Sequence, residues 1–254
     1  MSFTRELHQR NSLLHIVGWI YLSGAGILLM IIPLFPVEVL GINALIKPTK
    51  FLLSSTILVW TAAWLMYYLA AQGQVQIYSW IVVLVMSFEN IYITWQAFLG
   101  ELSHFNDSSD FHRMMFTLMG WAIGIMTGCT ILIGIQFYRK LRVELPAAYL
   151  WGIRLGILLF VIFAFEGYGM GAIKAHTVGG PDGGEGLPFV NWSTKHGDLR
   201  IAHFLGMHAL QILPLAGYYV FRQTRWLIVF AVIYLAVVTA IMVQAVMGIS
   251  LLPS

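Results

Sequence analysis

Residues 148–172 read AYLWGIRLGILLFVIFAFEGYGMGA and form an apolar stretch long enough to cross a membrane as one helix. About 20 predominantly apolar residues span the hydrocarbon core of a bilayer. Backbone N–H and C=O groups cannot remain unpaired in lipid, so such a stretch must be helical. Further stretches of this kind occur along the chain. The predicted membrane helices cover residues 13–35, 51–71, 77–99, 114–138, 148–172, 201–221 and 226–252.

The amino-acid composition agrees with this pattern. Of the 254 residues, 59% are hydrophobic and only 10% are charged, whereas soluble domains carry about 25% charged residues. We therefore predict an all-α integral membrane protein, a bundle of about seven transmembrane helices that forms a single domain over residues 1–254 and is surrounded by membrane lipids. The net charge of +3 is scattered along the chain, so no nucleic-acid partner is expected.

Lys and Arg residues between the helices predict the orientation in the membrane. Short cytoplasmic loops carry an excess of these residues. Arg5, Arg10, the cluster at residues 139–142, Arg222 and Arg225 all fall on one side, which we place in the cytoplasm. The N-terminus is then inside and the C-terminus outside, with the cell membrane as the expected location.

The loops predicted on the outer side are the longer ones, and they cover residues 36–50, 100–113 and 173–200. The last of them contains GGPDGGEG at residues 179–186, which cannot continue a helix. Phe189 and Trp192 in the same loop argue against disorder. We therefore expect a structured loop cap over the outer face of the bundle.

Ionisable residues inside the predicted helices point to a functional site. Such residues are costly in a membrane and usually face the bundle interior or a wet cavity. At a rise of about 1.5 Å per residue, Glu89, Glu166, His203 and His208 all fall near the midplane or in the outer half. This placement predicts a polar cavity open to the outer face. The depths allow two pairs, Glu166 with His203 and Glu89 with His208.

A carboxylate beside a histidine has three interpretations that the sequence does not separate. It can orient a metal-ligating imidazole, transfer a proton, or satisfy a buried polar group. The candidate catalytic residues are Glu89, Glu166 and His208. The candidate metal ligands are His203, His208, Glu166, Glu101, His104 and His176. The candidate substrate rim consists of Lys50, Asp198 and Arg200.

Helical geometry limits some of these groupings. His203 and His208 are five residues apart and point about 140° away from each other, so they are poorly placed to chelate one ion by themselves. His208 shares a helix face with Gln211. Glu101 and His104 would share one too if the third helix continued past residue 99, a spacing also found in di-iron bundles. We interpret His112 and His196 as surface histidines at the membrane interface.

Two cofactors are disfavoured by residue positions. Residues 226–252 contain no lysine, which the rhodopsins use to bind retinal in their last helix. A haem with two axial histidines is less expected than a metal ion, because only the helix at residues 201–221 carries well-placed histidines. Zinc, iron and copper are not distinguished.

The leading hypothesis is a membrane-embedded, metal-dependent enzyme that acts on a lipid or an amphiphilic small molecule, by hydrolysis or by redox chemistry. A proton-coupled transporter or a ligand-binding sensor using the same cavity is the alternative. Glycines at positions 120, 124 and 128 form Gly-x-x-x-Gly spacings in the helix at residues 114–138. These spacings favour close helix packing, either within the chain or in a homo-oligomer.

Overall fold

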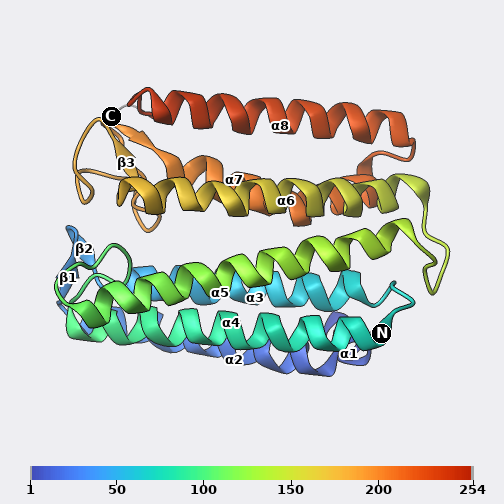
Figure 1. The fold of residues 1–254 in the computed structure, drawn as a ribbon, viewed down its shortest axis with the longest axis horizontal. Helices are drawn as coiled ribbons and strands as arrows, with labels where there is room; N and C mark the ends of the chain where they lie inside the picture. The colour runs from blue at the N-terminus through green and yellow to red at the C-terminus, as the bar shows by residue number, and fades with distance from the viewer. Residues whose placement is uncertain (1, 253–254) are drawn as a thin grey trace. The chain divides into compact units, whose positions relative to one another are not determined.

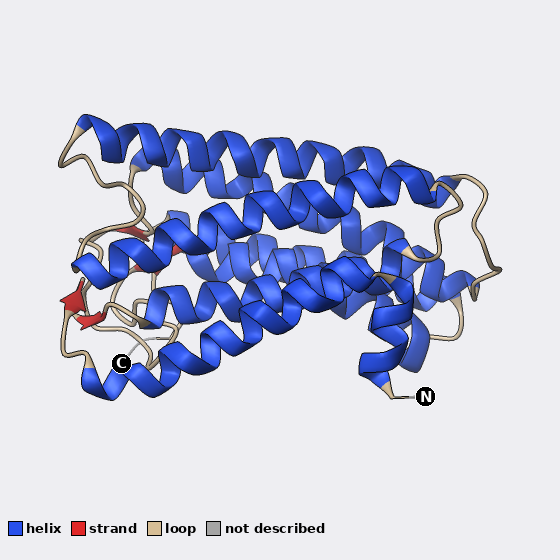
Figure 2. Ribbon diagram, turned by 90° about the horizontal axis from the view of Figure 1, so that it is seen from below, coloured by secondary structure: helices blue, strands red, loops and turns tan. Residues whose placement is uncertain are grey.

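The computed structural model describes residues 2–252, and almost all of its regular structure is helical (Figures 1 and 2). Seven of its helices are long and apolar enough to cross a membrane. The α-helices are α1 (Phe3–Arg10), α2 (Ser12–Ile31), α3 (Ile46–Met66), α4 (Gln72–Leu99), α5 (Asp110–Ile135), α6 (Ala147–Ile173), α7 (Leu199–Leu215) and α8 (Thr224–Val246). The strands are β1 (Glu38–Val39), β2 (Ile42–Asn43), β3 (Thr177–Val178) and β4 (Gly197–Asp198).

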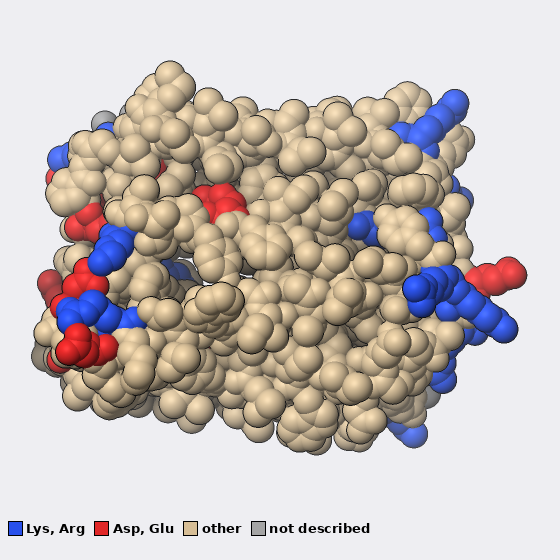
Figure 3. Space-filling model, in the orientation of Figure 1, with Lys and Arg blue, Asp and Glu red and all other residues tan. Residues whose placement is uncertain are grey.

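The chain divides into two compact units, Met1–Met126 and Thr127–Ser254, which we call unit 1 and unit 2. Unit 1 holds α1 to α4 and the beginning of α5, and unit 2 holds the end of α5 with α6, α7 and α8. On the face shown in Figure 3, Lys, Arg, Asp and Glu side chains gather near the helix ends, and the surface along the helices is almost free of them. This distribution is the one expected of membrane-spanning helices.

In unit 1, α2 and α3 pack closely because a glycine faces a tryptophan. A Cβ added to Gly18 would lie 2.0 Å from the Trp60 indole nitrogen. The same nitrogen donates a hydrogen bond to the backbone oxygen of His15 at 3.3 Å. Thr56 donates to the Gly18 carbonyl at 3.4 Å, a further contact between the two helices. Small residues at a helix contact allow this close approach in membrane bundles.

The short helix α1 was not predicted from the sequence. It is held to the end of α3 by Arg10, whose guanidinium carbon lies 3.9 Å from the Trp64 ring centroid and within 5 Å of the Tyr67 and Tyr68 rings. Arg10 also donates to the Trp64 carbonyl at 3.1 Å. These cation–π contacts explain why a charged residue tolerates a half-buried site. Leu7 of the same helix, α1, is fully buried.

In unit 2, α6 and α7 approach each other through glycines on both helices. A Cβ at Gly206 would lie 2.0 Å from the Phe163 ring, and one at Gly156 would lie 2.8 Å from the Ala209 carbonyl oxygen. Pro214 lies inside α7, and the helix continues as a π-helix at Ala216–Val220. Proline lacks the N–H that would donate to the carbonyl of residue 210, so the regular hydrogen bonding of α7 is interrupted before the π-helix begins.

Several predicted boundaries were wrong. The second helix, expected at residues 51–71, is α3 at Ile46–Met66, because Pro48 falls in the first turn, where a missing N–H is tolerated. The third begins at Gln72 rather than at residue 77. The last ends at Val246 rather than at residue 252, and Gly248 follows with a φ of +76° that terminates the helix.

The segment between α6 and α7 is structured, as Phe189 and Trp192 suggested. β3 pairs with β4 through Thr177 and Asp198, and a β-bridge joins Gly186 to Ser193. Ser250, after α8, donates to the Ser193 carbonyl at 3.2 Å and ties the segment to the end of the chain. Whether it covers the outer face of a membrane bundle stays a prediction.

Candidate functional site

The Glu166–His203 pair expected from helix depth is present in unit 2. The Glu166 Oε2 atom on α6 lies 3.0 Å from the His203 Nδ1 atom on α7. The Glu166 side chain is 7% exposed and the His203 side chain 24% exposed, so the imidazole retains a route to its surroundings. Gly167 makes room for the ring, since a Cβ there would lie 2.9 Å from the His203 Cε1 atom.

The Glu166 carboxylate determines which nitrogen of the His203 ring carries a proton. An ionised Glu166 only accepts hydrogen bonds, so Nδ1 of His203 donates and carries a proton. The Nε2 atom makes no hydrogen bond within residues 2–252. In the neutral ring it is a base that can accept a proton, bind a metal ion, or meet a donor on a substrate.

His208 belongs to a separate polar contact. Its Nδ1 atom lies 3.0 Å from the Gln211 Oε1 atom, which agrees with the shared helix face. The Phe204 ring packs against it at 4.3 Å between centroids, and Trp192 packs against Phe204 in turn. His203 and His208 thus have different partners, as their angular separation on the helix predicted. The expected pair of Glu89 with His208 joins unit 1 to unit 2 and stays a prediction.

His176 makes its hydrogen bonds with Asp182 within the segment between α6 and α7. Asp182 accepts hydrogen bonds from the His176 ring at 2.9 Å and from the backbone N–H groups of His176 and Thr177 at 3.0 and 2.8 Å. Burial raises the pKa of the Asp182 carboxyl, but these hydrogen bonds outweigh it and hold the pKa well below its ordinary range. Asp182 therefore orders the turn that His176 begins.

Two residues of the predicted substrate rim pair with each other. The fully buried Asp198 side chain accepts from Arg200 Nε at 2.9 Å and from the Ser193 backbone N–H at 2.8 Å. Arg200 also donates to the Asn191 carbonyl. Both residues thus stabilise the start of α7, whatever else they contact. Lys50 is half-buried in α3 of unit 1.

Glu101 and His104 do not share a helix face. α4 ends at Leu99, and Gly100 follows with a φ of +71°, a left-handed conformation that breaks the helix. Glu101 Oε2 instead lies 3.1 Å from His112 Nε2. His104 Nδ1 lies 3.3 Å from the Lys47 ammonium.

The interpretation of His112 as a surface histidine was wrong. Its side chain is 13% exposed, and besides Glu101 it contacts Tyr92 Oη and Gln96 Nε2, both at 3.2 Å from its Nδ1 atom. Tyr92 and Gln96 are four residues apart on one face of α4, a pattern that could have identified a shared partner. His196, the second histidine interpreted in this way, packs its ring against Gly180.

Glu89 lies on α4 of unit 1 and is 3% exposed. Its Oε1 atom has no hydrogen-bond partner, and the same is true of Asn90 Oδ1 and Gln96 Oε1. The Asn90 amide nitrogen donates to Ser55 on α3 and to the Met86 carbonyl, both at 2.8 Å. Buried polar atoms without partners are rare in folded proteins and call for an explanation.

The expected metal ligands are distributed over separate contacts. Within residues 2–252, no three His, Cys, Asp or Glu side chains converge as a metal-binding group requires. Glu166 and His203 form one pair, His208 bonds Gln211, His176 bonds Asp182, and Glu101 bonds His112. These residues alone therefore do not form a complete set of metal ligands, and a bound metal ion stays a proposal.

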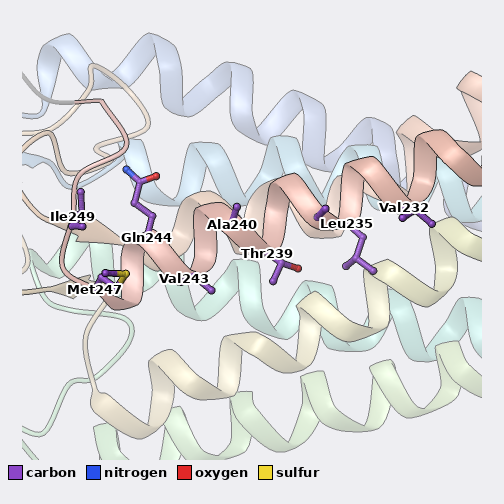
Figure 4. Close-up of a pocket in the computed structure, with 9 residues that line it drawn as sticks. Val232, Leu235, Thr239, Ala240, Val243, Gln244, Met247 and Ile249 are labelled. Atoms are coloured by element: carbon purple, nitrogen blue, oxygen red, sulfur yellow. The ribbon is translucent and has the colours of Figure 1, made fainter.

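A shallow apolar groove runs along α8, with a volume of about 670 Å³ (Figure 4). Its apolar lining includes Val232, Leu235, Val243 and Met247, and its polar side chains are Thr239 and, at the end toward Ile249, Gln244. None of the predicted catalytic or metal-binding residues lines it. Apolar lining on a membrane-type helix is what contact with lipid chains requires.

No family model, no curated protein and no solved structure matches this chain. The case for a function therefore depends on the chemistry of the residues described above.

Proposed function

We propose that this chain is a multi-pass membrane enzyme that uses Glu166 and His203 as an acid–base pair on an ester- or amide-linked amphiphile. The observation that carries the proposal is the 3.0 Å contact between Glu166 Oε2 and His203 Nδ1, which leaves Nε2 of His203 without a partner. A carboxylate that fixes one imidazole nitrogen and leaves the other unbonded is the arrangement that general base catalysis needs.

The pair supports hydrolysis with balanced proton transfer. Nε2 of His203 takes a proton from a water molecule, and the resulting hydroxide forms a bond to the carbonyl carbon of the substrate. Glu166 stabilises the imidazolium through the Nδ1–H bond. The bond from the carbonyl carbon to the leaving oxygen or nitrogen then breaks, and the leaving group takes the proton from Nε2. Such proton transfer by a positioned side chain contributes about 10²- to 10⁴-fold to a rate.

The position of the pair favours a substrate that reaches it from one leaflet. His203 lies four residues after the start of α7, about 6 Å along the helix axis. Glu166 lies seven residues before the end of α6. With the N-terminus in the cytoplasm, as the Arg and Lys distribution predicts, this depth belongs to the outer half of the membrane. Lipids and other amphiphiles place their carbonyl groups at such a depth.

A metal ion at His203 Nε2 stays part of the proposal. An imidazole whose other nitrogen donates to a carboxylate is a common metal ligand. Zinc, iron or copper bound there would polarise a carbonyl or activate water, but would need ligands beyond this pair. Elemental analysis and an absorption spectrum of the purified protein decide the point, with the His203→Gln variant as the comparison.

Hydrolysis of para-nitrophenyl esters with short and long acyl chains, by protein in lipid nanodiscs, tests the proposal. We expect turnover that favours the long chains and falls at least about 10²-fold in the Glu166→Gln and His203→Gln variants. Gly167→Ala should reduce kcat and alter the pH profile, because its Cβ displaces the His203 ring from Glu166. His8→Gln, at an exposed histidine of α1, is the matched control and should retain full turnover.

The same experiment separates the alternatives. Folded wild-type protein without esterase activity on any chain length, or with equal activity in all variants, contradicts the enzyme proposal. A proton flux in vesicles loaded with a pH-sensitive dye, driven by an added solute, would then favour the transporter.

A further inference from the structure

One face of α4 in unit 1 carries three polar side chains in a row. Glu89, Tyr92 and Gln96 stand at positions i, i+3 and i+7, so they lie along one stripe of the helix. Their exposed fractions are 3%, 2% and 0%. The stripe lies inside an otherwise apolar helix, where a polar group is retained only if it has a task or a partner.

Glu89 and Gln96 each present a buried oxygen without a hydrogen-bond donor. Both unpartnered atoms, Oε1 in each side chain, are acceptors. The occupant that such a site favours is therefore a donor, and the smallest one is a proton bound to the Glu89 carboxyl group.

A chain of titratable groups connects the stripe to the exposed end of α4. His112 Nδ1 lies 3.2 Å from Tyr92 Oη, and His112 Nε2 lies 3.1 Å from Glu101 Oε2. The Glu101 side chain is 43% exposed and reaches solvent. Phenol, imidazole and carboxylate can each release and accept a proton, so each link of this chain can transmit one.

The Gln96 amide determines which ring nitrogen of the neutral His112 carries the proton. Its Nε2 atom is a donor at 3.2 Å from His112 Nδ1, so this ring nitrogen accepts. The proton of the neutral ring is then on Nε2, where it faces the Glu101 carboxylate. In His112, the acceptor Nδ1 thus faces the buried Tyr92 and Gln96, and the donor Nε2 faces the exposed Glu101.

We propose that Glu89 is a proton-binding site, loaded and unloaded through Tyr92, His112 and Glu101. In unloading, the Glu89 side chain turns toward Tyr92, the next residue of the stripe, and gives its proton to Tyr92 Oη while Tyr92 gives its own to His112 Nδ1. His112 then releases its Nε2 proton to the Glu101 carboxylate. Glu89 loses one proton, Glu101 gains one, and the ring changes tautomer. Loading is the reverse sequence. This site lies in unit 1 and does not depend on the esterase proposed for unit 2.

Other titratable groups near the chain have separate partners. His104 contacts the Lys47 ammonium and Ser103 in the loop that follows α4. Tyr21 on α2 contacts Ser87 of α4 at 2.8 Å, and Ser87 is two residues before Glu89 and therefore on a different face of α4. These groups set the electrostatic surroundings of Glu89 and give the experiment its control.

Infrared difference spectroscopy of the protein in lipid films, between mildly acidic and mildly alkaline buffer, tests the site. We expect a carboxylic acid C=O band that shifts in D₂O and is lost in Glu89→Gln. It should remain in Glu38→Gln, a control outside the stripe. A wild-type difference spectrum without such a band, or one that Glu89→Gln leaves intact, overturns the proposal. If Glu89→Gln does not fold, labelling of wild-type protein with a hydrophobic carbodiimide assigns the band. An adduct at Glu89 supports the site, and adducts only at other carboxyl groups contradict it.

The rate of band formation after a pH jump tests the route. Tyr92→Phe removes one hydroxyl group and should slow the change at Glu89 by about 10²-fold. Tyr21→Phe removes a hydroxyl from a buried tyrosine of α2 and should leave the rate unchanged. Equal rates in wild type and Tyr92→Phe would show that the proton reaches Glu89 by another path.

Discussion

At the scale of single residues, the hydrogen bonds of the Asp182 carboxylate make the order of the β3–β4 segment depend on pH. Asp182 accepts from the His176 ring and from two backbone N–H groups, and its pKa is held below the ordinary range. A carboxyl whose pKa falls on folding contributes stability above its unfolded pKa of about 4 and loses it as the pH falls through the lower, folded value.

We therefore expect the β3–β4 segment to stay ordered from neutral pH down to about pH 4 and to loosen only below it. Asp182→Asn removes the charge and should loosen the segment at every pH. Hydrogen exchange of the His176 and Thr177 amides, corrected for the intrinsic pH dependence, measures this. Glu185→Gln is the matched control, since its ion pair with Lys195 is exposed and worth little. Equal protection in Asp182→Asn and wild type would contradict the expectation.

At the scale of helices, glycine decides which pairs can approach closely. Gly206 of α7 faces the Phe163 ring of α6, and an added Cβ would lie 2.0 Å from it. A Cβ at Gly128 of α5, also in unit 2, would meet no atom within 4 Å. The two glycines therefore differ in function although both lie in apolar helices.

Gly206→Ala should lower the free energy of unfolding by about 1–3 kcal/mol, the usual cost of overpacking. Gly128→Ala should change it by no more than about 0.5 kcal/mol. Unfolding in mixed detergent micelles, followed by tryptophan fluorescence, compares them. If copies of the chain associate through this part of α5, the alternative to packing within the chain, Gly128→Ala should also weaken chemical cross-linking between copies. Equal destabilisation by both substitutions would refute the packing argument.

At the scale of the whole molecule, the alternation of helices fixes the sides on which loops lie. If the N-terminus is in the cytoplasm, as the sequence predicts, Lys195 should lie outside and Lys140 inside. In a Cys129→Ala background, Lys195→Cys should react with a membrane-impermeant maleimide in intact cells. Lys140→Cys should react only after lysis. Both lysines are exposed, so the reverse pattern would establish the opposite orientation and move the Glu166–His203 pair to the inner leaflet.

The sequence by itself determined the all-helical architecture with its membrane-length helices, because apolar length and backbone hydrogen bonding leave no other solution in lipid. It also indicated the Glu166–His203 pair, since depth along a helix can be counted in residues, although the same count offered the Glu89–His208 pair as well. Only the tertiary structure decided that His112 belongs to the α4 stripe, that Arg10 anchors α1, and that the expected metal ligands form separate pairs. Those outcomes depend on contacts between segments distant in the chain, and helical periodicity carries no information about which neighbour a side chain meets.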